Sequence, residues 1–268
     1  MAAPRIHPSA VVSPQARLAD DVVIDAFAIV RDHVEIGAGT TVGPHTIIHD
    51  FVRIGSGNRI HSSLVIGGLP QVIGFDPATE TWLEIGDNNT LREGTSIHRA
   101  SKPEVSTRIG SNCFIMGYLH IGHDCQIGDG CILSNNTILG GHTEVGNKVV
   151  MGGAAAVHQF VRIGDYAMVG GFTPVRKDVM PFTMFTGSHG KHFRLNSVGL
   201  RRNGIKGERY HVVEQAFRQV RAGNKDLSGL EQTEEIVMLQ QWLAVKSKRG
   251  LSAFQQSRRA GSEEADSD

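Results

Sequence analysis

The sequence has few of the features that mark secreted, membrane-spanning or nucleic-acid-binding proteins. Its 268 residues include only three cysteines, and its 27 basic residues are balanced by 27 acidic ones. There is no basic field to attract nucleic acid. No apolar run approaches the ~18 residues of a membrane span, and the first residues lack the apolar core of a signal peptide. We therefore expect a cytoplasmic protein with no membrane span and no nucleic-acid partner.

The sequence is rich instead in a six-residue repeat that covers most of its length. One position in every six is aliphatic or Met over three runs, and the runs contain 26 such positions. A pattern this long indicates stacked structural repeats rather than a lone helix or strand. The repeat starts are Ile6, Val12, Leu18, Ile24, Val30, Ile36, Val42, Ile48, Ile54, Ile60, Ile66, then Ile85, Leu91, Ile97, then Ile109, Ile115, Ile121, Ile127, Leu133, Leu139, Val145, Met151, Val157, Ile163, Val169 and Val175.

This repeat predicts a parallel β-helix. The residue two positions before each start is usually small or β-branched, and side chains two apart on a strand share a face, so both point inward. Gly often follows the start, where it supplies the backbone angles of a corner. Three hexads make one triangular coil, and the coils stack into a prism of about ten turns.

The cysteines fall in one register of the repeat. Cys113, Cys125 and Cys131 each lie two residues before a repeat start, at the small inward position. Their spacing matches no common zinc pattern. We interpret them as buried spacers rather than as metal ligands.

Two insertions interrupt the repeat. The first lies between Ile66 and Ile85, and the second lies between Ile97 and Ile109. Insertions into a stacked repeat form loops, and such loops often lie on the binding face. Both precede the histidine-rich coils, which favours a functional role.

The pattern changes after Pro181. Residues 197–250 read as helices, and Ser228 followed by Glu231 resembles a capping box that opens one of them. We predict a β-helix domain at 1–186 and a helical domain at 187–256 that covers the last coil. The acidic stretch 257–268 has no large apolar residue and is predicted to be disordered.

Four of the thirteen histidines are predicted to share one edge of the prism. Repeat starts 18 residues apart lie one coil apart, so His123, His142 and His158 fall in three successive coils and span ~10 Å. His120 ends the preceding hexad and approaches the same corner.

The residues leave three interpretations of this cluster open: a solvated ladder of polar side chains, a metal site, or a general base with substrate-binding imidazoles. Asp124 directly follows His123 and can orient it, and Gly140-Gly141-His142 offers backbone N–H groups suited to an oxyanion. The residues favour the third interpretation, because no inner shell of Asp, Glu or Cys suits a metal. We expect neither a metal nor a cofactor, and we expect three prisms to pack as a homotrimer with clefts between them.

The motifs around these histidines resemble one family. His120-Ile-Gly-His-Asp-Cys125, the segment from Ile132 to His142, and Ala156-Val-His-Gln-Phe160 are similar to the acyl-[acyl-carrier-protein]–UDP-N-acetylglucosamine O-acyltransferases of lipid A biosynthesis. The resemblance covers nearly the whole chain. It implies an all-β, left-handed parallel β-helix of hexapeptide repeats with a C-terminal α-helical extension, assembled as a homotrimer. It also implies transfer of a 3-hydroxyacyl chain from acyl carrier protein to the 3-hydroxyl of a UDP-linked N-acetyl amino sugar.

The resemblance also implies roles for individual residues. His123 matches the general base, Asp124 matches the residue that orients it, and the Gly141 N–H matches the donor to the oxyanion. His120, His142, His158 and Gln159 match residues that line the substrate cleft. Gly171 matches the position that limits acyl length, and His189, Asn196 and Arg202 match nucleotide-binding and donor-binding positions.

Four positions depart from the family pattern. Val72 and Gly74 stand in the first insertion where Asp and Lys are usual, Val198 stands where Glu is usual, and Asn203 stands where a second Arg is usual. These departures predict altered recognition of the acceptor. The alternatives are a paralogous acyltransferase with another nucleotide sugar or an amine as acceptor, a metal-dependent β-helix hydrolase or hydratase, and a non-catalytic β-helix.

Overall fold

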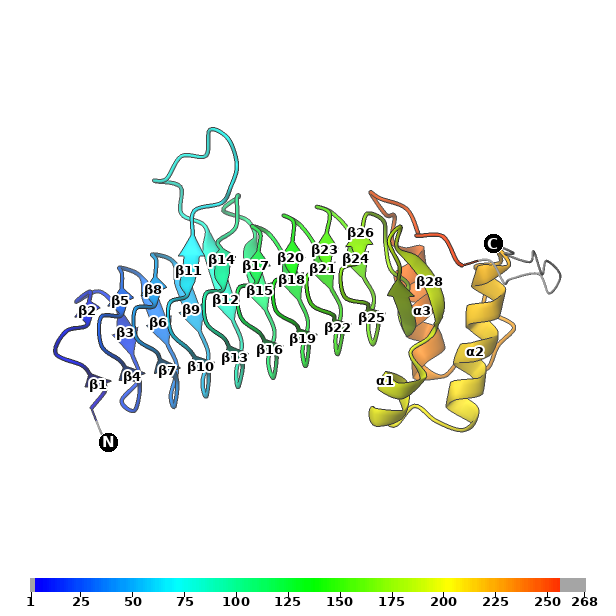
Figure 1. Ribbon diagram of the computed structural model, residues 1–268, viewed down its shortest axis with the longest axis horizontal. Coiled ribbons are helices and arrows are strands. Elements are labelled where there is room, and N and C mark those ends of the chain that lie inside the picture. The colour runs from blue at the N-terminus through cyan, green and yellow to red at the C-terminus, as the bar shows by residue number, and fades with distance from the viewer. Residues whose placement is uncertain (1–2, 256–268) are drawn as a thin grey trace, which may run out of the picture.

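The structure is a computed structural model that describes residues 3–255, so the tail predicted to be disordered lies outside the described residues. The chain winds into a long prism of stacked coils, followed by a hairpin and three helices at one end (Figure 1). This is the predicted left-handed parallel β-helix with a C-terminal helical part, which is confirmed.

Three parallel sheets form the faces of the prism. The first sheet contains β1 (Arg5–Ile6), β4 (Val23–Ile24), β7 (Thr41–Val42), β10 (Arg59–Ile60), β13 (Thr90–Leu91), β16 (Phe114–Ile115), β19 (Ile132–Leu133), β22 (Val150–Met151), β25 (Met168–Val169), β27 (Thr183–Thr186) and, antiparallel to β27, β28 (Lys191–Leu195). The second contains β2 (Val11–Val12), β5 (Ile29–Val30), β8 (Ile47–Ile48), β11 (Val65–Gly68), β14 (Ser96–His98), β17 (His120–Ile121), β20 (Ile138–Leu139), β23 (Ala156–Val157) and β26 (Pro174–Val175). The third contains β3 (Arg17–Leu18), β6 (Val34–Ile36), β9 (Val52–Ile54), β12 (Trp82–Ile85), β15 (Ser106–Ile109), β18 (Gln126–Ile127), β21 (Glu144–Val145) and β24 (Arg162–Ile163).

Strand register follows the repeat. Ile121 pairs with Leu139, and Leu139 pairs with Val157, so residues 18 apart lie directly above one another. The repeat starts from Ile24 onward are buried inside the prism, and all three cysteines are free and buried beside them. The cysteines are therefore spacers, as predicted.

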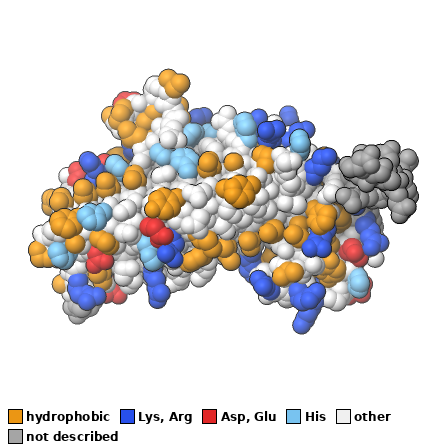
Figure 2. All heavy atoms as spheres, in the orientation of Figure 1, with side chains coloured by type: hydrophobic (Ala, Val, Ile, Leu, Met, Phe, Trp, Pro, Cys, Tyr) orange, Lys and Arg blue, Asp and Glu red, His pale blue; other side chains and the backbone are white. Residues whose placement is uncertain are grey.

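The two insertions form loops at the corner between the second and third sheets. Residues 69–81 connect β11 to β12 and project from the prism as the cyan loop of Figure 1. Hydrophobic side chains cover this protruding loop in Figure 2, and Ile73 is fully exposed. The buried Arg99, which lies in the second insertion, donates a hydrogen bond to the Pro77 carbonyl at 3.0 Å and so ties the two loops together.

Three helices follow the hairpin: α1 (Ser197–Arg202), α2 (Glu208–Arg221) and α3 (Glu234–Ala244). Among the described residues, no helix is both long and apolar enough to cross a membrane. The capping box predicted at Ser228 is wrong, because α3 begins six residues later, with Thr233 at its N-cap. The Ser228 N–H instead bonds the side chain of Asp226 in a turn.

The prism and the helices have separate apolar cores that meet near the hairpin. Phe185 packs in the core of the prism, whereas Phe182 packs with the helices. β28 continues the first sheet past residue 186. The division of the chain at 186 and 187 stays a prediction.

After α3 the chain turns back along the prism, and we call residues 245–255 the C-terminal strap. Leu251 forms a β-bridge with Asp178, and Phe254 forms one with His192. His192 is fully buried between the rings of Phe185 and Phe254. Its Nε2 accepts the Met180 N–H at 2.8 Å, and its Nδ1 lies 3.1 Å from the Ser252 carbonyl, to which it donates. A neutral His192 ring therefore uses both of its nitrogens in hydrogen bonds, one as acceptor and one as donor.

We predict that the strap makes folding stability depend on pH through His192. Burial lowers the pKa of His192 from 6.5 to about 4. Between about pH 4 and pH 6.5, the unfolded chain therefore binds a proton at His192 that the folded chain does not bind. Stability is complete above pH 6.5 and falls as the pH drops toward 4, by about 3 kcal/mol from this group. Urea unfolding at pH 7.5 and pH 5 measures the loss.

The matched variant for this prediction is His192→Gln. It lowers stability at pH 7.5 but should show a smaller difference between the two pH values than the native protein. An equal difference in both proteins would contradict the assignment to His192.

Candidate functional site

The predicted histidine edge exists at the corner between the second and third sheets. His123 and Asp124 follow β17, His142 follows β20, and His158 follows β23. Backbone hydrogen bonds stack these turns, and the His142 N–H donates to the His123 carbonyl at 2.9 Å. Asp124 and His142 both have φ near +60°, which turns their side chains toward the same side of the corner.

Asp124 is the anchor of the site. Its side chain is almost fully buried, and one carboxylate oxygen lies 2.6 Å from Nδ1 of His123. Ser101, from the second insertion, donates its N–H at 3.0 Å and its hydroxyl at 2.6 Å to the same carboxylate. Burial alone would raise the pKa of Asp124, but these hydrogen bonds and the nearby His142 lower it to about 2. Asp124 is therefore ionised at neutral pH.

This contact determines the tautomer of His123. An ionised carboxylate only accepts hydrogen bonds, so the Nδ1–H of His123 donates to Asp124. The Nε2 atom then carries the free lone pair. The geometry is that of an oriented general base.

His142 lies beside this pair. Its Nε2 is 3.5 Å from the Asp124 carboxylate, and its ring stacks on Phe160 with centroids 4.5 Å apart. Burial lowers the pKa of His142, Asp124 raises it, and His123, Lys248 and Lys102 lower it further. The balance favours a neutral imidazole at neutral pH.

Gly141 packs directly against the His123 ring. A Cβ at this position would lie 2.7 Å from Nε2 of His123, so a side chain here would displace the His123 ring. Within residues 3–255, no hydrogen bond uses the Gly141 N–H. This N–H is available as a donor to a developing oxyanion.

His120 lies on β17 in the same coil, with its Nδ1 3.0 Å from the Ser96 hydroxyl. Its ring centroid is 5.1 Å from that of His98, a residue that sequence reasoning missed. Burial lowers the pKa of both rings. The pairing of Ile97 with Ile121 brings these histidines together, but the second insertion hides that pairing in the sequence.

His158 and Gln159 are exposed on the next coil. Arg249 of the C-terminal strap reaches both, with one guanidinium nitrogen 2.6 Å from His158 Nδ1 and another 2.9 Å from the Gln159 carbonyl. Lys248 lies 4.3 Å from the centre of the Phe160 ring. The strap is therefore part of the corner.

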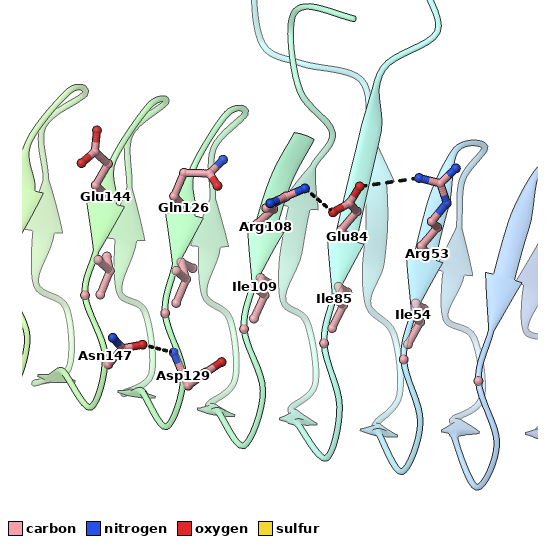
Figure 3. Close-up of a pocket in the computed structure, with 18 of the residues that line it drawn as sticks. Arg53, Ile54, Glu84, Ile85, Arg108, Ile109, Gln126, Asp129, Glu144 and Asn147 are labelled. Carbon is pink, nitrogen blue, oxygen red and sulfur yellow. Dashed lines mark hydrogen bonds and ion pairs between the residues drawn. The ribbon is translucent and has the colours of Figure 1, made fainter. Parts of the chain in front are cut away.

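A cavity of about 660 Å³ opens beside the corner. Asp124, His142, Phe160, Lys102 and Lys248 are among the residues that line it. A larger hollow of about 1210 Å³ lies on the third sheet and has no histidine in its lining. Figure 3 shows part of that hollow, in which Glu84 lies between Arg53 and Arg108 and contacts both.

The remaining predicted residues lie away from the His123 corner. Gly171 lies at the corner between the first and second sheets, His189 lies in the turn between β27 and β28, and Arg202 ends α1. Asn196 caps α1: its amide donates to the Tyr166 carbonyl at 2.9 Å and accepts the Gly199 N–H at 3.1 Å. A single chain does not bring these four residues to His123.

His123, Asp124 and His142 also have the spacing of a metal site, with ligand atoms within 4.8 Å of one another. The donors fit a metal poorly, because the Asp124 carboxylate already accepts three hydrogen bonds from His123 and Ser101. Such a carboxylate is arranged to orient an imidazole.

Two family profiles match parts of the chain. The profile of the family described as UDP N-acetylglucosamine O-acyltransferase, domain 2, matches residues 178–261. The profile of bacterial transferase hexapeptide repeats matches residues 15–50 and 106–141.

Relatives match over most of the chain. The acyl-[acyl-carrier-protein]–UDP-N-acetylglucosamine O-acyltransferase of Campylobacter lari is 40% identical over 94% of this chain and 98% of its own. That of Halorhodospira halophila is 42% identical over 81% and 84%. The structure of LpxA from Acinetobacter baumannii superposes with a TM-score of 0.87 at 34% identity, over 92% of this chain and 99% of that one. The chain belongs to the family of acyl-[acyl-carrier-protein]–UDP-N-acetylglucosamine O-acyltransferases.

Proposed function

We propose that this protein transfers a 3-hydroxyacyl chain from acyl carrier protein to the 3-hydroxyl of UDP-N-acetylglucosamine, the first step of lipid A biosynthesis, in the cytoplasm. The donor and acceptor are those in the names of its relatives. The observation that carries the proposal is the His123–Asp124 pair, which leaves the Nε2 lone pair free beside Gly141, whose N–H makes no hydrogen bond within residues 3–255.

The chemistry follows from this arrangement. Nε2 of His123 takes the proton from the acceptor hydroxyl as its oxygen attacks the thioester carbonyl. The Gly141 N–H donates to the resulting oxyanion. When the intermediate collapses, the C–S bond breaks, and the imidazolium returns the proton to the departing thiolate. No acyl-enzyme is needed.

Electrostatics supports this cycle. The ionised Asp124 lies 2.6 Å from His123 and stabilises the imidazolium that forms during the reaction. The neighbouring His142 is kept neutral by burial, so it adds no competing positive charge. It can instead contact substrate together with His120, His158 and Gln159.

We further propose that the protein works as a homotrimer, with sites between protomers. Gly171 lies at a different corner of the prism from His123, so a neighbouring protomer is the natural source of the acyl-length position. Phe172 at that corner is 84% exposed and Tyr118 is 66% exposed, which leaves an apolar ridge for a partner to cover. Figure 2 shows further hydrophobic side chains along this view of the prism.

His189, Asn196 and Arg202 would contact the nucleotide or the donor.

The residues of the first insertion favour a second candidate function, in which the enzyme acylates a different acceptor. Val72 and Gly74 stand where the family pattern has Asp and Lys, so two charged groups are missing, and Val72 is exposed. Val198 on α1 is also exposed, and the Asn203 amide is bonded to the Gly199 carbonyl. A paralogous enzyme that acylates another nucleotide-linked amino sugar, at a hydroxyl or an amine, fits these positions.

The base assignment predicts that His123→Ala lowers kcat for acyl transfer to UDP-N-acetylglucosamine by about 10²–10⁴-fold. Mass spectrometry of products from acyl-carrier-protein donors measures this, and the same assay with other nucleotide-linked amino sugars compares acceptors. The control is His33→Asn, because His33 stacks on Phe51 at the same corner in a distant coil. A native rate in the His123 variant would rule out the mechanism.

Metal independence is also predicted. Because protein donors occupy the Asp124 carboxylate, treatment with EDTA followed by desalting should leave the acyl-transfer rate unchanged. Elemental analysis of the untreated protein accompanies the assay. Stoichiometric zinc that is lost in His142→Ala, together with chelator-sensitive activity, would instead favour a metal-dependent hydrolase or hydratase.

The oligomer proposal predicts a sedimenting species of three chains. Phe172→Glu places a charge on the apolar ridge and should shift the protein toward monomer, with a loss of activity. Phe193→Glu, a change at another exposed ring on β28, is the matched control. Analytical ultracentrifugation measures the number of chains in the native protein and in both variants. A native protein that sediments as a monomer would refute the proposed trimer.

A further inference from the structure

We propose that Arg249, on the C-terminal strap, is a positioning residue that holds His158 in the tautomer with its proton on Nε2. The imidazole then presents a hydrogen-bond donor to the substrate. This role rests on the proposed acyl transfer, although the tautomer itself can be measured without substrate.

The strap fixes the backbone around Arg249. The hydroxyl of Ser247 accepts the Arg249 N–H at 3.0 Å and the Gly250 N–H at 2.7 Å. The Gly250 carbonyl then accepts the Asp178 N–H at 2.9 Å, and the Ser252 N–H donates to the Asp178 carbonyl at 2.9 Å. Arg249 is thus anchored immediately before a segment that pairs with the prism.

The Arg249 side chain is held at two points. One guanidinium nitrogen donates to the Gln159 carbonyl at 2.9 Å, and another lies 2.6 Å from Nδ1 of His158. A guanidinium is always protonated and only donates hydrogen bonds. Nδ1 of His158 must therefore accept, and the ring proton must lie on Nε2.

A competing contact shows what Arg249 changes. Nδ1 of His158 is also 3.2 Å from the Gln159 carbonyl, a pairing that would require a proton on Nδ1. The two contacts exclude each other, and the shorter contact, to a charged donor, prevails. Without Arg249, the carbonyl would draw the proton to Nδ1 and leave Nε2 as an acceptor.

Two imidazoles at this corner are then held in opposite tautomers. Asp124 accepts from Nδ1 of His123, which frees Nε2 to act as a base. Arg249 donates to Nδ1 of His158, which makes Nε2 a donor. Such a donor suits an acceptor atom of the substrate, such as a carbonyl oxygen of the donor's thioester arm or a phosphate oxygen of the nucleotide.

The first test is the tautomer, measured by two-bond ¹⁵N–¹H correlation on protein labelled with ¹⁵N-histidine. The His158 signals are identified by their absence in His158→Gln. We expect a proton on Nε2 in the native protein and in Arg249→Lys, which retains a charged donor. In Arg249→Glu the carboxylate accepts, so the proton should move to Nδ1. A proton on Nδ1 in the native protein would overturn the proposal.

The second test is kinetic. Arg249→Met keeps the length but has no donor, and it should raise KM by about tenfold, the usual effect of losing one such hydrogen bond, with a smaller change in kcat. Arg249→Lys should recover most of the loss. Arg218→Met on the outer face of α2 is the control for removing an exposed Arg. Native KM and native tautomer in Arg249→Met would refute the role.

Failure of the two proposals can be told apart. A protein without acyl-transfer activity would disprove the function, whereas the tautomer experiment would still decide the role of Arg249.

Discussion

Backbone hydrogen bonds between successive coils hold each corner residue directly above its counterpart 18 residues earlier, and the functional corner depends on this stacking. The His142 N–H bonds the His123 carbonyl, and the Phe160 N–H bonds the Gly141 carbonyl. The spacing of the proposed catalytic residues is thereby set by the backbone rather than by side-chain packing alone. Such rigid support holds groups within the small tolerances that catalysis needs.

The corner acquires its chemistry from segments outside the repeat. Ser101, in the second insertion, supplies two of the three hydrogen bonds that keep Asp124 ionised. Lys248 and Arg249, in the C-terminal strap, contact Phe160 and His158. The coils therefore provide positions, whereas the irregular segments supply polar contacts to the residues that occupy those positions.

The period of the sequence predicts the prism, the buried cysteines and the shared corner of His123, His142 and His158, because each depends only on counting residues along a regular winding. Counting fails across an insertion, and so it missed His98 and Ser101. It also fails for contacts distant in sequence, such as Arg249 with His158, 91 residues apart. The capping box at Ser228 failed because an Asp226 turn competes for the same backbone.

The buried cysteines have a practical consequence. Burial raises the pKa of Cys125 to about 12, and all three thiols are enclosed in the prism. Maleimides and iodoacetamides must reach a thiol before its thiolate can react, so enclosure of all three thiols should leave the folded protein nearly inert to these reagents. A cysteine introduced on the surface would then accept a fluorophore or spin label selectively, without removal of the native thiols.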